Sequence, residues 1–126
     1  MFNYLDLLGK RFEYGGRGPE AYDCLGLAIE CCRRVGKELM DIRGLTHYQE
    51  IDGEIKNQLS NFCLIDKPEP FCLVTFKIKP PFVSHIGFVL PSCYEFLHIT
   101  RDSSVNKARL DDLIWKPRIA NFVKLK

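Results

Sequence analysis

The sequence predicts an α+β fold in which N-terminal helices pack on an antiparallel β-sheet. Helix-forming segments fill the first half of the chain, and β-branched and aromatic runs fill the second half. Helices first and strands second is the order typical of segregated α+β folds. A length of 126 residues fits one domain, residues 1–126, because two separate cores would each be marginally small.

Two helices are expected before residue 37. Apolar positions across residues 2–14 are compatible with one short amphipathic helix. Residues 25–35 form the second helix, because Asp23 supplies an acidic cap before it and Gly36 supplies a stop signal after it. Residues 41–62 are interpreted as polar helix and loop.

Four strands are expected in the second half of the chain. Each is a run of β-branched and aromatic residues bounded by proline or polar turn residues. They cover residues 71–78, 85–90, 94–99 and 119–123. Short connections between them favour an antiparallel meander. The single tryptophan, Trp115, is interpreted as a core residue.

Composition excludes several functional classes. The net charge of +2 is too small to indicate nucleic-acid binding, which usually needs a concentrated basic stripe. No apolar run approaches the ~20 residues that a membrane helix needs, so no membrane association is expected. The first residues do not form a signal peptide, so synthesis in the cytoplasm is expected.

The six cysteines do not follow the spacing of zinc or redox sites, so no metal and no cofactor are expected. Five of them are interpreted as reduced packing residues: Cys31, Cys32, Cys63, Cys72 and Cys93. The exception is Cys24, which lies where the second helix begins.

Cys24 has the surroundings that a nucleophilic thiol needs. The positive end of a helix dipole and a nearby imidazole both favour the thiolate, so a lowered thiol pKa is expected. The glycine-rich loop at residues 15–19 would let a substrate approach closely. Gly26 is unfavourable inside a helix and is expected to leave room beside the thiol. Asp23 would oppose the thiolate unless its carboxylate is aimed away as a cap.

Two histidines on neighbouring predicted strands are candidates for the base. His85 and His98 lie thirteen residues apart across one turn, where side chains of adjacent antiparallel strands can meet. One imidazole can take the thiol proton while the other orients it, which makes His85 the general base and His98 the third member. The main-chain N–H groups of Cys24 and Leu25 are candidate donors to an oxyanion. From spacing alone, packed cysteines and solvated histidines remain an open alternative.

These residues resemble the NlpC/P60 family of cysteine peptidases. Residues 14–19 and 22–27 resemble its nucleophile motif, a Gly-Gly loop followed by Asp-Cys-x-Gly-Leu. Residues 84–90 resemble its Ser-His-Val-Gly-Ile-Tyr strand, and residues 96–98 resemble the strand that brings the third polar residue. The blocks occur in order across residues 10–123, and ordered blocks are more specific than any single one.

The resemblance implies a papain-like fold and hydrolysis of amide bonds in peptidoglycan stem peptides, typically between D-glutamate and the diamino acid. It assigns Cys24 as nucleophile, His85 as base and His98 as orienting residue, with a thioester acyl-enzyme. The compact length and the loop are most similar to the phage-tail branch of the family. Tail or secretion components are therefore expected as partners that deliver the protein to the cell wall.

Some substrate-binding positions follow the family and others depart from it. Phe12 stands where the family usually has a tyrosine that lines the site, and Tyr14 is a candidate substitute. Leu25 replaces a common serine, and residues 71–72 replace Gly-Asp. Arg17, in the loop before the nucleophile, is a candidate for holding a substrate carboxylate, with a solvated loop arginine as the alternative.

Other functions remain open at this point. The Phe12 departure favours a catalytically weak or inactive tail or cell-wall-binding module. A thiol acyltransferase or an amidase acting on a non-murein amide keeps the same chemistry with a different acceptor or substrate. Zinc bound by cysteine and histidine is a weaker third idea.

Overall fold

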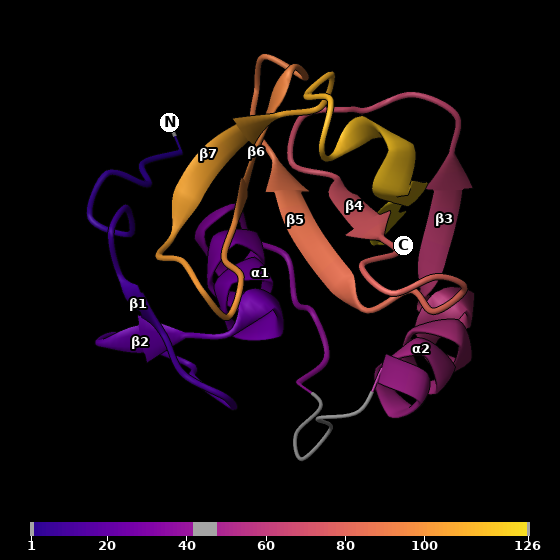
Figure 1. Ribbon diagram of the computed structural model, residues 1–126. Coiled ribbons are helices and arrows are strands. Elements are labelled where there is room, and N and C mark those ends of the chain that lie inside the picture. The colour runs from indigo at the N-terminus through magenta and orange to yellow at the C-terminus, as the bar shows by residue number, and fades with distance from the viewer. Residues whose placement is uncertain (1, 42–47, 126) are drawn as a thin grey trace.

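The computed structural model describes residues 2–41 and 48–125. Within these ranges the chain forms two α-helices and a six-stranded antiparallel sheet (Figure 1). The helices are α1, Cys24–Arg34, and α2, Tyr48–Asn57, which continues into the 3-10 turn η1, Gln58–Asn61. The strands of the sheet are β3, Phe62–Ile65; β4, Leu73–Phe76; β5, His85–Val89; β6, Glu95–His98; β7, Asn106–Arg109; and β8, Ile119–Leu125. The α+β class predicted from the sequence is confirmed.

The strand order in the sheet is β3-β8-β4-β5-β6-β7. Strands β4 to β7 form a meander, each antiparallel to the next, and its first three strands are ones that the sequence predicted. The fourth predicted strand, residues 119–123, does not continue the meander, because it belongs to β8, which returns to lie between β3 and β4. A 3-10 turn, η2 (Lys116–Arg118), leads into β8, and a short parallel pair, β1 (Arg11–Phe12) and β2 (Ala21–Tyr22), precedes α1.

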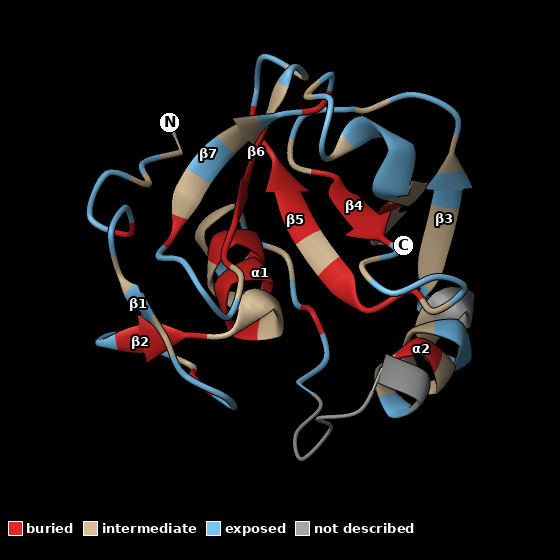
Figure 2. Cartoon of the chain, in the orientation of Figure 1, coloured by how far each residue is buried: buried red, intermediate tan, exposed pale blue. Residues whose placement is uncertain are grey.

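Helix α1 begins and ends within one residue of the predicted bounds, because the expected signals are present. The Asp23 side chain caps its first turn, and Gly36 adopts a positive φ of 78° just after it. One face of the helix is buried against β5 and β6, as the red segments of Figure 2 show. Leu27 is fully buried in this contact, and burying a leucine contributes about 1.5–3 kcal/mol.

The sheet carries apolar side chains on both of its faces. Successive strand residues point to opposite faces, so Phe88 packs toward α1 while Val89 packs away from it. The second face holds a separate cluster that includes Phe76, Phe96 and Trp115. The expectation that Trp115 lies with the core is thus borne out in part, since it packs against this cluster while remaining half-buried.

The predicted helix over residues 2–14 is wrong. Residues 5–9 form turns, and β1 follows them. The Asn3 side chain accepts a hydrogen bond from the Leu5 N–H, and Gly9 adopts a positive φ of 86°; both favour turns over a helix.

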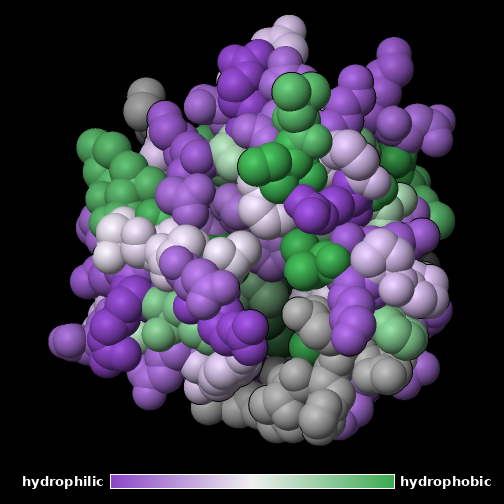
Figure 3. Space-filling model, in the orientation of Figure 1, coloured by the Kyte–Doolittle hydropathy of each residue, from purple (hydrophilic) through white to green (hydrophobic). Residues whose placement is uncertain are grey.

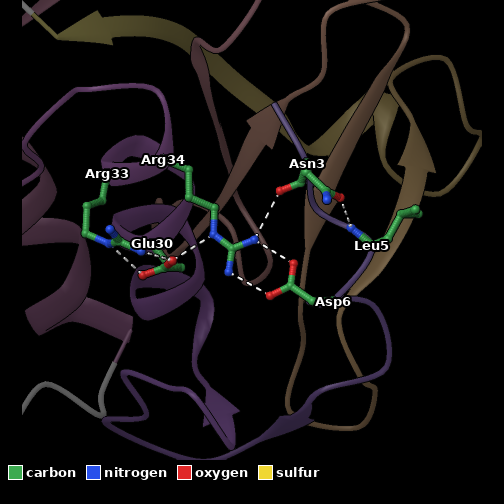
Figure 4. A network of polar contacts seen from close by, with 6 residues as sticks. All are labelled: Asn3, Leu5, Asp6, Glu30, Arg33 and Arg34. Carbon is green, nitrogen blue, oxygen red and sulfur yellow. Dashed lines mark hydrogen bonds and ion pairs between the residues drawn. The ribbon is translucent and has the colours of Figure 1, made fainter. Parts of the chain in front are cut away.

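Ion pairs hold this N-terminal segment on α1. Arg34 donates to both carboxylate oxygens of Asp6, at 2.7 and 2.8 Å, and to the main-chain oxygen of Asn3 (Figure 4). The same guanidinium donates to Glu30 on its own helix. Arg34 therefore gives this segment a fixed position that apolar periodicity alone could not reveal.

Several strands were not predicted. Strand β7 has a polar sequence, and β3 begins at Phe62, at the end of the stretch read as polar helix and loop. Within that stretch α2 confirms the expected helix, whereas residues 42–47 lie outside the described residues.

None of the helices in the described ranges is long and apolar enough to cross a membrane.

Candidate active site

Cys24 is the first residue of α1, and the residue before it caps the helix. One carboxylate oxygen of Asp23 accepts from the Gly26 N–H at 2.7 Å, and the other accepts from the Gly15 N–H at 3.0 Å. Asp23 thus ties the helix to the glycine-rich loop. Its carboxylate is used as the cap that the sequence allowed for.

The glycine-rich loop packs directly on the first turn of α1. A Cβ atom at Gly26 would overlap the carbonyl oxygen of Gly16, and that same oxygen accepts from the Asp23 N–H. Gly16 is itself enclosed, since a Cβ there would lie 2.8–2.9 Å from the main chain of three neighbours. The absence of a side chain at Gly26 therefore makes room for the loop, and open space beside the thiol stays a prediction.

Arg17 holds the loop together from within. Its guanidinium donates to Asp23 and to Asp41, both at 2.8 Å, and to the Gly16 carbonyl oxygen. The Asp41 and Asp23 carboxylates and the Arg17 side chain are partly shielded from solvent. These contacts give Arg17 a structural role, and its proposed contact with a substrate carboxylate stays a prediction.

The electrostatics of the thiol differ from the expectation. Burial, together with a smaller contribution from the charge of Asp23, raises the pKa of Cys24 to about 11. The main-chain N–H groups of Ile86, Leu25 and Cys24 itself oppose this shift. The helix terminus therefore acts on the sulfur as predicted, but desolvation outweighs it, and the expected lowering of the pKa is wrong for this structure.

The two histidines meet as predicted. His85 is the first residue of β5 and His98 is the last residue of β6, and the His85 Nε2 atom lies 3.0 Å from the His98 Nδ1 atom. Both side chains are almost fully buried, with exposed fractions of 5% and 3%. Their rings lie with Phe76 and Phe96, on the side of the sheet that carries the second cluster.

Trp115 covers this histidine pair, and sequence reasoning did not connect it with the site. Its ring stacks on His85 at 5.6 Å between centroids and meets His98 edge-on at 4.7 Å. It reaches them from the segment between β7 and β8, where no periodic pattern signals a contact. Because the indole shields both rings from water, it contributes to their electrostatic state.

Both imidazoles are held neutral. Burial lowers the pKa of His85 to about 3, with a further contribution from the His98 charge. Burial also lowers the pKa of His98 to about 4, and a side-chain hydrogen bond with Asn106 partly opposes this. At neutral pH the resting site therefore contains a protonated thiol and two uncharged rings. A neutral imidazole is the form that can accept a proton.

The Cys24 thiol lies beside the segment that carries His85, but in the described part of the chain it makes no hydrogen bond to the His85 ring. The N–H of Ile86, the residue after His85, donates a hydrogen bond to the Cys24 sulfur. No hydrogen bond joins that sulfur to the His85 ring among the contacts of the described residues. Since Nε2 is used by His98, Nδ1 is the nitrogen left to accept the thiol proton. Catalytic hydrogen bonds often tighten only when substrate binds.

Tyr14 lies at the surface near the loop. Its side chain is 58% exposed, its ring meets Phe12 edge-on at 5.0 Å, and its hydroxyl accepts from Arg101 at 3.4 Å. A role for the Tyr14 hydroxyl in substrate binding therefore remains a prediction.

A groove of about 690 Å³ opens next to the nucleophile. Leu25, which follows Cys24, and Ile86, which follows His85, both line it. Apolar side chains from the segment after α1, from α2, from the sheet and from the loop before β5 supply most of its exposed lining: Leu39, Met40, Ile55, Phe62, Val83, Val123 and Leu125. Three charged side chains, Glu38, Asp41 and Lys56, also line it. In the space-filling view, hydrophobic surface lies at the floor of a hollow on this side of the molecule (Figure 3).

The remaining cysteines do not form a site. All six cysteines are free thiols, and burial raises the pKa of Cys32 and Cys72 to about 11. Within residues 2–41 and 48–125, no group of three or more His, Cys, Asp or Glu side chains could hold a metal ion.

A thiol at a helix N-terminus and a neighbouring strand that starts with one of two hydrogen-bonded histidines bring together the residue types that nucleophilic cysteine chemistry uses. The fold itself is that of NlpC/P60 proteins. It is similar to an NLP/P60-family protein from Staphylococcus aureus, with a TM-score of 0.71 and 17% identity over 96% of this chain and 38% of that one. It is also similar to NlpC2 from Trichomonas vaginalis, with a TM-score of 0.69 and 19% identity over 94% of this chain and 42% of that one.

A third similar structure is a domain of comparable size. The NlpC/P60 domain of the peptidoglycan hydrolase SagA gives a TM-score of 0.59 and 19% identity, over 95% of this chain and 90% of that one. The chain spans less than half the length of the two proteins above. Comparisons of the sequence with protein-family models and with curated proteins found no match. At these identities the likeness establishes the fold.

Proposed function

We propose that this protein is a cysteine peptidase or amidase of the NlpC/P60 family that hydrolyses amide bonds in peptidoglycan stem peptides. The observation that carries the proposal is the position of Cys24 at the start of α1. Its sulfur contacts the main-chain N–H of Ile86, the residue that follows His85 of the hydrogen-bonded histidine pair. The fold supports it, because one of the similar structures is a domain of a peptidoglycan hydrolase.

The first half of the reaction forms a thioester. Nδ1 of His85 takes the thiol proton as the Cys24 sulfur attacks the amide carbon, and the carbonyl oxygen becomes an oxyanion. The main-chain N–H groups of Cys24 and Leu25, in the first turn of α1, donate to this oxyanion in the proposed mechanism. Collapse of the tetrahedral intermediate breaks the C–N bond, and the imidazolium gives its proton to the leaving amine.

The second half regenerates the enzyme. His85, again neutral, takes a proton from water as the water oxygen attacks the thioester carbon. The C–S bond breaks, the carboxylic acid leaves, and the proton returns to the sulfur. His98 keeps the ring of His85 oriented through both halves by the 3.0 Å hydrogen bond.

The finer assignment follows the sequence resemblance. The bond cleaved is of the D-glutamyl–diamino acid type, and a phage tail or a secretion system delivers the protein to the cell wall. The bond type rests on the motifs around Cys24 and His85, whereas the delivery route rests on the compact length and the glycine-rich loop.

A second candidate function is favoured by the groove beside the nucleophile. Most of its exposed lining is apolar, with Glu38, Asp41 and Lys56 as its charged members, whereas a stem peptide presents several charged groups. An amide or thioester whose acyl part is apolar would bury that part in the groove. The same Cys24 chemistry would then serve an acyltransferase or an amidase on a non-murein substrate.

Isolated sacculi test the proposal directly. The wild-type protein should release soluble fragments that carry paired new amino and carboxyl termini, and Cys24→Ala should release none. Cys63→Ala, which removes a half-buried thiol in β3, is the matched control and should retain activity. Equal release by wild type and Cys24→Ala would remove Cys24 from the chemistry.

A parallel assay separates the two candidate functions. Purified muropeptides and N-acyl amino acids of increasing chain length are offered to the same preparations. Cleavage of muropeptides alone supports the cell-wall peptidase. Cleavage of acyl amides alone, lost in Cys24→Ala, supports the second candidate and contradicts the first.

A further inference from the structure

Asn106 lies at the far end of the histidine pair. It is the first residue of β7 and pairs in register with His98 on β6, so their side chains share one face of the sheet. Asn106 is half-buried next to the His98 ring, and its side chain raises the pKa of His98 against the effect of burial, which is the direction that a hydrogen-bond acceptor gives. Because Nδ1 of His98 already faces His85, Nε2 is the ring nitrogen left for Asn106.

The orientation of the Asn106 amide is set by the main chain. Its Nδ2 atom donates to the carbonyl oxygen of Ser104 at 2.7 Å. An amide whose nitrogen is held in this way presents its oxygen, Oδ1, in the other direction. Oδ1 only accepts, so the Nε2 atom of His98 that faces it carries a proton.

This one assignment fixes the protons on both rings. With Nε2 protonated, neutral His98 has an unprotonated Nδ1, which can only accept. The 3.0 Å contact then requires Nε2 of His85 to donate. Neutral His85 is left with an unprotonated Nδ1, which is the nitrogen that the proposed mechanism needs as its base.

We propose that Asn106 is a positioning residue that sets the tautomers of His98 and His85 and so leaves Nδ1 of His85 free to accept the thiol proton. The catalytic consequence rests on the proposed function, whereas the tautomer assignment does not. During the reaction the proton from Cys24 binds Nδ1 of His85. The two Nε2 protons stay where they are and keep donating toward Asn106, so no further proton leaves the site.

Nitrogen spectroscopy tests the assignment without any substrate. In protein labelled with ¹⁵N-histidine, long-range proton–nitrogen correlation spectra distinguish protonated from unprotonated ring nitrogens. Both buried rings of the wild type should carry the proton on Nε2. In Asn106→Ala the acceptor is lost, and the Nδ1-protonated form should appear in one or both rings. Asn106→Asp keeps an acceptor at the same place and should keep the wild-type tautomers.

Kinetics test the consequence. Asn106→Ala should lower kcat by about tenfold, a part of the roughly 10²–10⁴-fold that a general base contributes, with KM unchanged. Asn106→Asp should restore most of kcat. Lys107→Ala, on the exposed side of the same strand, is the control for damage to β7 and should behave as wild type.

The outcomes separate the two proposals. An Nδ1-protonated ring in the wild type, or unchanged tautomers in Asn106→Ala, overturns the role of Asn106 even if the protein is active. Wild-type tautomers that change in Asn106→Ala support it even if no substrate is cleaved, in which case the proposed function fails alone.

Discussion

The nucleophile and its base are held by opposite means. Cys24 stands among main-chain N–H groups, a helix cap and an arginine–aspartate network, all of them polar. The imidazoles of His85 and His98 stand among aromatic rings, with the Asn106 side chain as a polar neighbour of His98. The polar groups around Cys24 fix the position of its sulfur, whereas the aromatic rings around the two histidines keep the base uncharged.

The difference explains why neither group is charged at rest. Burial raises the pKa of the thiol and lowers the pKa of both imidazoles, so an ion pair between them is disfavoured on both sides. The site is therefore poised for general-base chemistry, in which the proton moves only as the sulfur attacks. It does not store a ready thiolate.

The largest expected effect concerns the imidazole side and is loss of stability in acid. The folded pKa values of about 3 for His85 and about 4 for His98 lie below the ordinary value of 6.5. As the pH falls below 6.5, the unfolded chain binds protons that the folded protein does not. The free energy of unfolding should fall by up to about 1.4 kcal/mol per pH unit for each histidine until the folded pKa values are reached.

Urea unfolding at a series of pH values measures this slope. Trp115→Ala provides the comparison, because water admitted to both rings raises their pKa values and should make the slope shallower. A free energy of unfolding that stays constant from neutral pH down to the folded pKa values would mean that the rings are not buried as described.

The next effect concerns the polar side and is structural. Gly26→Ala places a methyl group against the Gly16 carbonyl oxygen and should destabilise the protein by about 1–3 kcal/mol. Helix propensity alone predicts the opposite sign, a gain of about 1 kcal/mol. Gly53→Ala in α2 is the matched control, because its methyl group meets nothing within 4 Å and should follow propensity. Thermal unfolding of both variants decides between packing and propensity.

The smallest effect concerns the charge next to the thiol. Asp23→Asn retains an oxygen that can cap α1 but removes the negative charge that raises the Cys24 pKa. The pH profile of alkylation by iodoacetamide should therefore move to lower pH in this variant. In the wild type, alkylation of Cys24 should be slow at neutral pH and rise toward pH 11. Fast neutral alkylation of the wild type would show that the thiol is already ionised.

The sequence predicted the parts of the site that local signals encode. The cap at Asp23, the helix behind it and the strands of His85 and His98 all follow from patterns within a few residues. Asn106 was not predicted, because β7 is a polar edge strand without alternating hydrophobicity. Trp115 reaches the histidines through tertiary packing alone.

The direction in which the Cys24 pKa shifts could not be predicted from the sequence either. A helix terminus before Cys24 indicates a lowered pKa, but the outcome depends on how far Ile86 and its neighbours exclude water. The turns at residues 5–9 escaped prediction for a similar reason, since their position depends on a distant arginine, Arg34. Burial and long-range ion pairs are properties of the assembled fold.

The place of β8 in the sheet has a consequence for synthesis. Strands β3 and β4 have no ladder with each other and are joined only through β8. A ribosome-bound chain that has already made β4 to β7 therefore exposes the open edge of β4, and open strand edges invite pairing with other chains. During synthesis the nascent chain is therefore prone to aggregation until residues 119–125 leave the exit tunnel and pair with β3 and β4.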